Sequence, residues 1–340
     1  MTDPAPIGVH LNGSIPLATA EEVFRLAVGV LGPRIRRVPD GETGPRSNWI
    51  EWQLPVLQRQ PSLETVPPDP EHYRPLPRVQ FRPGTSALHL GGLGYAEAAR
   101  ASWLVFSRLQ ASGELPAGLR FQVSLPTPLA PMAIFVMAHD QAAIEERYEQ
   151  RMLEELREIV DAIPHHRLSI QWDTAVEFAL LEGVFPAWFA DVRDQIVERL
   201  LRLGNAVPPD VELGYHLCYG DAGHRHFVEP SDTSNLVDVA MAVARGLERP
   251  LAWIHMPVPR SRDDPEYFRP LRDLHLADTT ELYLGLVHRT DGFNGARRRA
   301  AAAAEFVPNF GVATECGMGR RPPETVPDLL RLHAELAVPR

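Results

Sequence analysis

The feature that most constrains the fold is the alternation of short apolar segments with longer amphipathic ones along most of the chain. The short segments have the composition of strands, and the longer ones repeat apolar residues at helical spacing. Strands are predicted at residues 7–15, 34–39, 120–125, 168–172, 211–219, 251–256, 281–287 and 311–314. Helices are predicted at residues 19–31, 95–110, 141–163, 186–203, 233–247, 265–274, 295–306 and 325–336. This order is typical of parallel strands covered by helices.

The alternation predicts an α/β fold in which residues 1–340 form one domain, a single (β/α)8 TIM barrel. An open, doubly wound sheet is the alternative, because the number of strands does not show whether a sheet closes. Residues 45–118 interrupt the alternation, and prolines are dense between Pro55 and Pro83. We interpret this stretch as a long proline-rich insertion after the second strand that acts as a lid.

Composition excludes several classes of function. The formal net charge of −10 argues against a protein that binds nucleic acid. All 34 basic residues are arginine, which excludes a lysine Schiff base, a pyridoxal phosphate enzyme and a Walker P-loop. Hydrophobic residues make up 44% of the chain, enough for a large core. No uncharged apolar stretch is long enough to span a membrane.

The termini and the cysteines indicate a compartment. The first residues lack the basic region and the apolar core of an export signal. Two cysteines in so long a chain are typical of a reducing environment, in which thiols stay free to bind metal. We therefore expect a cytoplasmic protein.

Polar residues follow nearly every predicted strand. In a (β/α)8 barrel the active site lies at the carboxyl ends of the strands. Those ends carry Ser14, Asp40 with Glu42, Thr127, Asp173, His216 with Cys218, His255, His288 with Asp291, and Glu315 with Cys316. We expect these side chains to surround one site. Trp49 is expected in its wall, and Asp40 and Glu42 are expected to contact the substrate.

Two of these strand ends predict a metal site. Residues two apart on a strand point the same way, so His216 and Cys218 leave one face together. Cys316, the only other cysteine, follows the last predicted strand at an equivalent place. An imidazole and two thiolates suit Zn²⁺. The alternative is that both cysteines are small buried apolar residues and that His216 is only hydrogen-bonded.

Four short motifs resemble those of a known family. They are Gly13-Ser-Ile-Pro16, Ile170-Gln-Trp-Asp173, Tyr215-His-Leu-Cys-Tyr219 and Thr314-Glu-Cys-Gly317. In the same order, they are similar to the Gly-Ser-Phe-Pro, Gln-Ile-Asp, His-x-Cys and Asp-Cys-Gly motifs of the catalytic barrel of cobalamin-independent methionine synthase. That barrel belongs to the uroporphyrinogen decarboxylase and methionine synthase-like superfamily. The resemblance implies a zinc ion held by the histidine and both cysteines, and an aspartate that holds the amino group of a thiol substrate.

The chain also departs from the family pattern. The family's fourth zinc ligand is a glutamate on the strand after His-x-Cys; here that strand carries Trp253-Ile-His-Met256, so His255 is the nearest candidate. The family's catalytic histidine lies in the motif Asp-x-His-Ser. The corresponding segment of this chain is Val287-His-Arg-Thr-Asp291. His288 is therefore the expected proton carrier, and Asp291 is expected to orient it. The folate-using enzyme has a second barrel with no counterpart in this chain. These departures put homocysteine and methyl-folate in doubt as substrates.

Several of the expected site residues have a structural interpretation as well. Asp173 either holds a cationic amine or caps the next helix, and Ser14 is the candidate for a substrate carboxylate. His255 is either a ligand or a buried, hydrogen-bonded imidazole. Glu315 either contacts substrate or supports the neighbouring cysteine. The loop histidines His224 and His226 either reach the substrate or are solvated.

We predict a zinc-dependent transferase that moves a methyl or other alkyl group onto a substrate thiol bound to zinc as a thiolate. The expected partners are a small-molecule thiol and an alkyl donor, which is a small electrophile, a corrinoid or a corrinoid protein. One alternative is a metal-free lyase that resembles uroporphyrinogen decarboxylase. Another is a barrel with a purely structural zinc site. Metal content separates the first alternative from the transferase, and an exchangeable coordination position separates the second.

Overall fold

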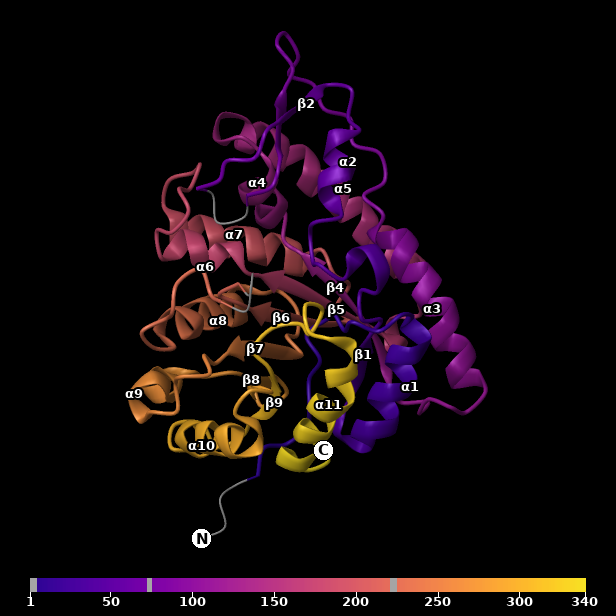
Figure 1. The fold of residues 1–340 in the computed structure, drawn as a ribbon, viewed down its shortest axis with the longest axis vertical. Helices are drawn as coiled ribbons and strands as arrows, with labels where there is room; N and C mark the ends of the chain where they lie inside the picture. The colour runs from indigo at the N-terminus through magenta and orange to yellow at the C-terminus, as the bar shows by residue number, and fades with distance from the viewer. Residues whose placement is uncertain (1–4, 72–74, 221–224) are drawn as a thin grey trace.

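The centre of the molecule is a curled sheet of parallel strands surrounded by helices (Figure 1). The computed structural model describes residues 5–71, 75–220 and 225–340. Within them the main sheet has seven strands in the order β1, β4, β5, β6, β7, β8, β9. Their bounds are Arg37–Pro39 (β1), Arg120–Pro126 (β4), Leu168–Thr174 (β5), Glu212–Leu217 (β6), Trp253–Pro257 (β7), Glu281–Val287 (β8) and Gly311–Thr314 (β9). Because neighbouring strands are parallel, each connection returns outside the sheet and carries the covering helices.

The covering helices pack their apolar faces inward. On α5, for example, Ile144, Tyr148 and Met152 are fully buried. A capping box begins α1, where the Thr19 hydroxyl accepts from the Glu22 amide and the Glu22 carboxylate accepts from the Ala18 amide. The longer helices are Ala20–Leu31 (α1), Tyr95–Ala111 (α3), Gln141–Ala162 (α5), Val192–Asn205 (α7), Ser234–Gly246 (α8), Gly292–Ala304 (α10) and Val326–Leu336 (α11).

Shorter elements complete the fold. Two short helices follow the carboxyl ends of β4 and β5, and another precedes β8. They are Leu129–Phe135 (α4), Val176–Leu181 (α6) and Pro265–Phe268 (α9). Across the described part of the chain, no helix is both long enough and apolar enough to cross a membrane.

The prediction of a closed (β/α)8 barrel is wrong, because the sheet is open between β1 and β9. The expected first strand, residues 7–15, forms only isolated bridges within the described residues, at Ile7 and Val9. Gly8 and Gly13 have positive φ angles of 84° and 141°, which interrupt an extended strand.

Side chains bond two main-chain carbonyls near the end of this segment. The amide nitrogen of Gln122 donates to the carbonyl of Leu11 at 3.0 Å, and that of Gln171 donates to the carbonyl of Asn12 at 2.7 Å. These carbonyls are therefore satisfied without a main-chain ladder. A doubly wound sheet is not formed either, since the strands follow in chain order without a reversal.

The interrupted region 45–118 contains its own short elements. Helix α2 (Gln53–Gln58) precedes an antiparallel pair, β2 (Leu63–Val66) and β3 (Arg78–Phe81), and the region includes α3. The pair extends beyond α4 at the top of Figure 1. Val79 bridges to Val136, directly after α4, so β3 is joined to the chain that leaves the carboxyl end of β4. A lid role for this region stays a prediction.

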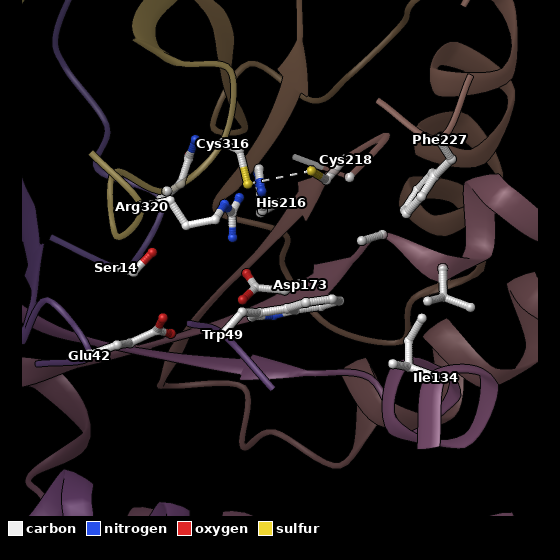
Figure 2. Close-up of a pocket in the computed structure, with 15 residues that line it drawn as sticks. Ser14, Glu42, Trp49, Ile134, Asp173, His216, Cys218, Phe227, Cys316 and Arg320 are labelled. Atoms are coloured by element: carbon white, nitrogen blue, oxygen red, sulfur yellow. Dashed lines mark hydrogen bonds between the residues drawn. The ribbon is translucent and has the colours of Figure 1, made fainter. Parts of the chain in front are cut away.

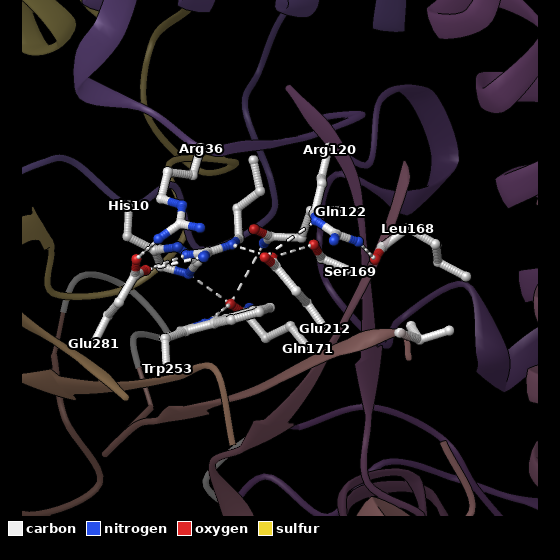
Figure 3. Close-up of polar contacts among 12 residues, drawn as sticks. His10, Arg36, Arg120, Gln122, Leu168, Ser169, Gln171, Glu212, Trp253 and Glu281 are labelled. Carbon is white, nitrogen blue, oxygen red and sulfur yellow. Dashed lines mark hydrogen bonds and ion pairs between the residues drawn. The ribbon is translucent and has the colours of Figure 1, made fainter. Parts of the chain in front are cut away.

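A buried ion pair connects two strands that are not neighbours in the sheet, at the amino ends of the strands (Figure 3). Arg37, on β1, is 2% exposed and donates from both terminal nitrogens to Glu281 on β8 at 2.9 Å. Its Nε donates to Glu212 on β6 at 3.2 Å, and its guanidinium lies 4.2 Å from the centre of the Trp253 ring. Strands β1 and β8 are not neighbours, so this arginine spans the inside of the curl.

Replacing Arg37 with alanine is expected to lower the free energy of unfolding by about 3 kcal/mol, because buried carboxylates lose their shared partner. Arg36 provides the matched control: it also bonds Glu281, at 2.8 Å, but its side chain is 53% exposed. Arg36→Ala is expected to cost less than about 1 kcal/mol. Urea unfolding of both variants measures the difference, and equal effects would contradict a special role for Arg37.

Candidate metal centre

The register of three neighbouring strands places polar residues in one row. Asp173 on β5 is paired with His216 on β6, and His216 is paired with His255 on β7. Partners in register on adjacent strands are about 4.8 Å apart, and their side chains leave the same face. Strand pairing therefore brings a carboxyl group and two imidazoles together near the carboxyl ends of the strands.

Three predicted ligands meet beside this row (Figure 2). The ligand atoms of His216, Cys218 and Cys316 lie within 4.8 Å of one another. His216 and Cys218 are buried, and Cys316 is half-buried. Cys218 follows β6 and Cys316 follows β9, so the chain folds between these strands to join residues that are distant in sequence. This cluster can bind a metal ion.

The donor set and its spacing fit zinc. Two sulfurs that each lie ~2.3 Å from a tetrahedral zinc ion are about 3.8 Å from each other. The sulfurs of Cys218 and Cys316 are 3.6 Å apart. One imidazole and two thiolates also match zinc sites that keep a fourth position for water or substrate.

His255 lies behind His216 and has partners at both ring nitrogens. Its Nδ1 is 2.7 Å from Nδ1 of His216, and its Nε2 is 3.0 Å from the carbonyl oxygen of Thr314. A carbonyl only accepts, so we assign the proton of His255 to Nε2. Nδ1 of His216 then donates to His255, which leaves Nε2 of His216 as the nitrogen for an ion. Burial holds the pKa of His216 well below its usual range and lowers that of His255 to about 4.

The cluster faces a cavity that four other expected residues line. Ser14, Glu42, Trp49 and Asp173 lie around it together with the three ligands (Figure 2). The hydroxyl of Ser14 accepts from the Gly319 amide at 3.3 Å. The structure thus places these four side chains around one cavity, and their roles in a site stay predictions.

Two buried carboxyl groups share this cavity. Burial raises the pKa of Asp173 well above its usual range, even though Gln171 donates to its Oδ1 at 2.8 Å. Burial also raises the pKa of Glu42, and the negative charge of Asp173 acts in the same direction. Two buried acidic groups disfavour each other's charge, and the positive charges of Arg46 and Arg320 offset this in part for Glu42. A cationic ligand between the carboxyl groups would favour their charged forms further.

Asp40 and Asp291 have structural partners in place of the predicted ones. Asp40 accepts from Arg46 at 2.6 Å and from the Ser102 hydroxyl at 2.7 Å, and it does not line the cavity of the cluster. Asp291 was expected to orient His288, but it binds Arg299 at 2.6 and 3.0 Å. Arg299 is fully buried, so it needs a carboxylate that accepts from both terminal nitrogens.

His288 is held by other groups. Its Nε2 donates to the carbonyl of Val258 at 2.8 Å, and its Nδ1 lies 3.6 Å from Glu315. Burial lowers the pKa of His288. His226 also contacts Glu315, and although burial opposes its charge, this contact raises the pKa of His226 to about 9. His224 lies outside the described residues.

Two features of the site are not among the residues expected from the sequence. Arg320 lines the cavity beside the cluster. It lies four residues after Cys316, just beyond a strand end, and this position in the sequence could have indicated a site residue. Gln171 and Asn12 fix the wall of the site through their side chains, and Asn12 donates to the Thr314 carbonyl at 2.8 Å. Side-chain hydrogen bonds between such distant segments cannot be predicted from a pattern in the sequence.

Comparison with known proteins gives a structural neighbour. No family model matches the chain, and no curated protein matches it. A crystal structure from Listeria monocytogenes, of a protein provisionally named a vitamin-B12 independent methionine synthase, has a similar fold with a TM-score of 0.58. The two chains are 14% identical over 98% of this chain and 97% of the other. The likeness shows that the two proteins share a fold.

Oxidation tests the proximity of the two thiols. In metal-free protein, the mild oxidant diamide is expected to join Cys218 and Cys316 in a disulfide, because their sulfurs are already adjacent. Zinc added first is expected to prevent this, as both thiolates are then ligands. Intact-mass measurement detects the loss of hydrogen. His216→Ala keeps both thiols and should retain the oxidation while losing zinc protection; thiols that stay reduced without metal would contradict the geometry.

Proposed function

We propose that the protein is a zinc-dependent transferase that moves a methyl or other alkyl group onto a substrate thiol. The observation that carries this proposal is the meeting of His216, Cys218 and Cys316 at the wall of a cavity that also holds two carboxyl groups. The fold neighbour supports it, because that protein is provisionally named a methionine synthase, and a methionine synthase transfers a methyl group to a thiol.

His216, Cys218 and Cys316 would hold the zinc ion, which would lower the pKa of an incoming thiol and so supply it as a thiolate. In the transfer, the substrate sulfur forms a bond to the alkyl carbon. The bond between that carbon and its leaving group breaks, and its electron pair departs with the leaving group.

The carboxyl groups of Asp173 and Glu42 are the proposed holders of a cationic group on the thiol substrate. They are buried, and a bound cation would offset the cost of charging them together. Ser14 and Trp49 line the same cavity, where Ser14 can donate to a substrate carboxylate and Trp49 can cover an apolar part. This arrangement supports a thiol that also carries an amine.

His288 is the proposed proton carrier, with Glu315 in place of Asp291 as its charged neighbour. Because Nε2 of His288 donates to a main-chain carbonyl, Nδ1 is the nitrogen that faces Glu315. A neutral imidazole held in this way can accept a proton at Nδ1. The alkyl donor is proposed to be a small electrophile, a corrinoid or a corrinoid protein.

We further propose that His255 orients His216 and does not itself bind the ion. Both of its ring nitrogens are occupied, one by His216 and one by the Thr314 carbonyl. Hydrogen bonds of this kind fix the tautomer and the ring orientation of metal-binding histidines. With His255 in this orienting role, His216, Cys218 and Cys316 would be the only three protein ligands among the described residues, and a substrate thiol could complete the set.

Purified protein is expected to contain about one zinc per chain, as a single three-ligand site requires. L-Cysteine or 3-mercaptopropionate, added to the zinc protein, should add a sulfur neighbour in the zinc X-ray absorption spectrum. A zinc environment unchanged by every thiol would support the structural-zinc alternative. Metal-free protein with an intact fold and full activity would support the metal-free lyase.

His255→Ala separates the two roles of this histidine. If His255 orients His216, the variant should bind zinc about 10- to 100-fold more weakly with the same ligand count. Competition with a chelator measures the affinity, and X-ray absorption counts the neighbours. Asn12→Ala, which removes only the 3.3 Å contact to His255 and a bond to Thr314, is the milder control. Loss of one nitrogen neighbour in His255→Ala would instead make His255 a ligand.

A further inference from the structure

A second cavity, of about 280 Å³, lies beside the metal centre and has no role in the proposal above. It opens at the carboxyl ends of the strands, and Glu315, one residue before Cys316, forms part of its wall. Three arginines from three different loops line it: Arg225 after β6, Arg260 after β7 and Arg321 after β9. His226 and His288 also line this cavity.

The carboxylates of this cavity are already matched by other groups. Glu315 and Glu229 both contact His226, Glu229 at 3.4 Å, and Glu315 also faces His288. In contrast, no ion pair within 4.0 Å involves Arg260 or Arg321 among the described residues. The guanidinium groups of Arg260 and Arg321 therefore line the cavity without an ion pair among the described residues, while His226 and His288 lie against Glu315, whose pKa the nearby charge of Arg321 also lowers.

We propose that this cavity binds an anionic group, a carboxylate, phosphate or sulfonate, of one substrate of the transfer. Guanidinium groups present planar pairs of donors that match the oxygens of these groups. The inference rests on the proposed function only in naming a substrate as the carrier. Because Glu315 adjoins Cys316, a ligand held here extends toward the metal centre. Without lysine in the chain, arginine is the residue available to recognise such an anion.

Anion binding tests the proposal directly. Calorimetric titration of the full-length protein with inorganic phosphate, acetate and methanesulfonate, at constant ionic strength, distinguishes the three classes. Arg260→Gln and Arg321→Gln are each expected to weaken the binding of whichever anion binds most tightly by about tenfold, because each variant loses a charge-assisted hydrogen bond. Arg297→Gln removes the same charge from an exposed position on α10, outside the cavity, and should change binding less than twofold.

The same titrations separate this inference from the proposed function. They are run on zinc-loaded and on metal-stripped protein, after thermal unfolding has shown that each variant is folded. Binding that depends on Arg260 and Arg321 in both forms supports the anion site, whether or not thiol transfer occurs. Binding of none of the three anions overturns the site, even if zinc and thiols bind. Equal weakening by all three variants, Arg297→Gln included, also overturns it, because it would reflect general charge alone.

Discussion

The buried guanidinium of Arg37 is the interaction on which the shape of the sheet most depends. It connects β1 to Glu281 on β8 and to Glu212 on β6, strands that are not its neighbours in the sheet. Hydrogen bonds between adjacent strands set their spacing but do not fix how far an open sheet curls. An ion pair across the inside of the curl does fix it, and at the amino ends it leaves the carboxyl ends free for the site.

At the carboxyl ends of the strands, the curl of the sheet brings together residues that are distant in sequence. Register across β5, β6 and β7 aligns Asp173, His216 and His255, and curling brings Cys316 from β9 to the sulfur of Cys218. A stabilising layer of arginine and glutamate therefore lies at one end, and a layer of titratable groups with perturbed pKa values lies at the other. Groups of the second kind are typical of sites that bind or react.

Two cavities at this end contain many, though not all, of the expected site residues. One joins the sulfur ligands to Asp173 and Glu42, and the other joins His288, His226 and Glu315 to three arginines. The first holds the cluster that can bind a metal ion, and the second holds the proposed anion site. The two proposals together place the two substrates of the proposed transfer in neighbouring cavities.

The sequence by itself determined the alternation of strands and helices, and the His-x-Cys pair with Cys316 as its distant partner. These are local patterns, set by apolar spacing and by the alternation of side chains along a strand. The tertiary structure sets the open sheet: residues 7–10 make main-chain bonds to Arg34, Phe310 and Val312 without forming a strand, and Gln122 and Gln171 bond the carbonyls of residues 11 and 12. It also decided that Asp291 binds Arg299 and that the ring of His255 contacts His216. Such pairings depend on which side chains meet across the fold, and spacing along one chain does not specify them.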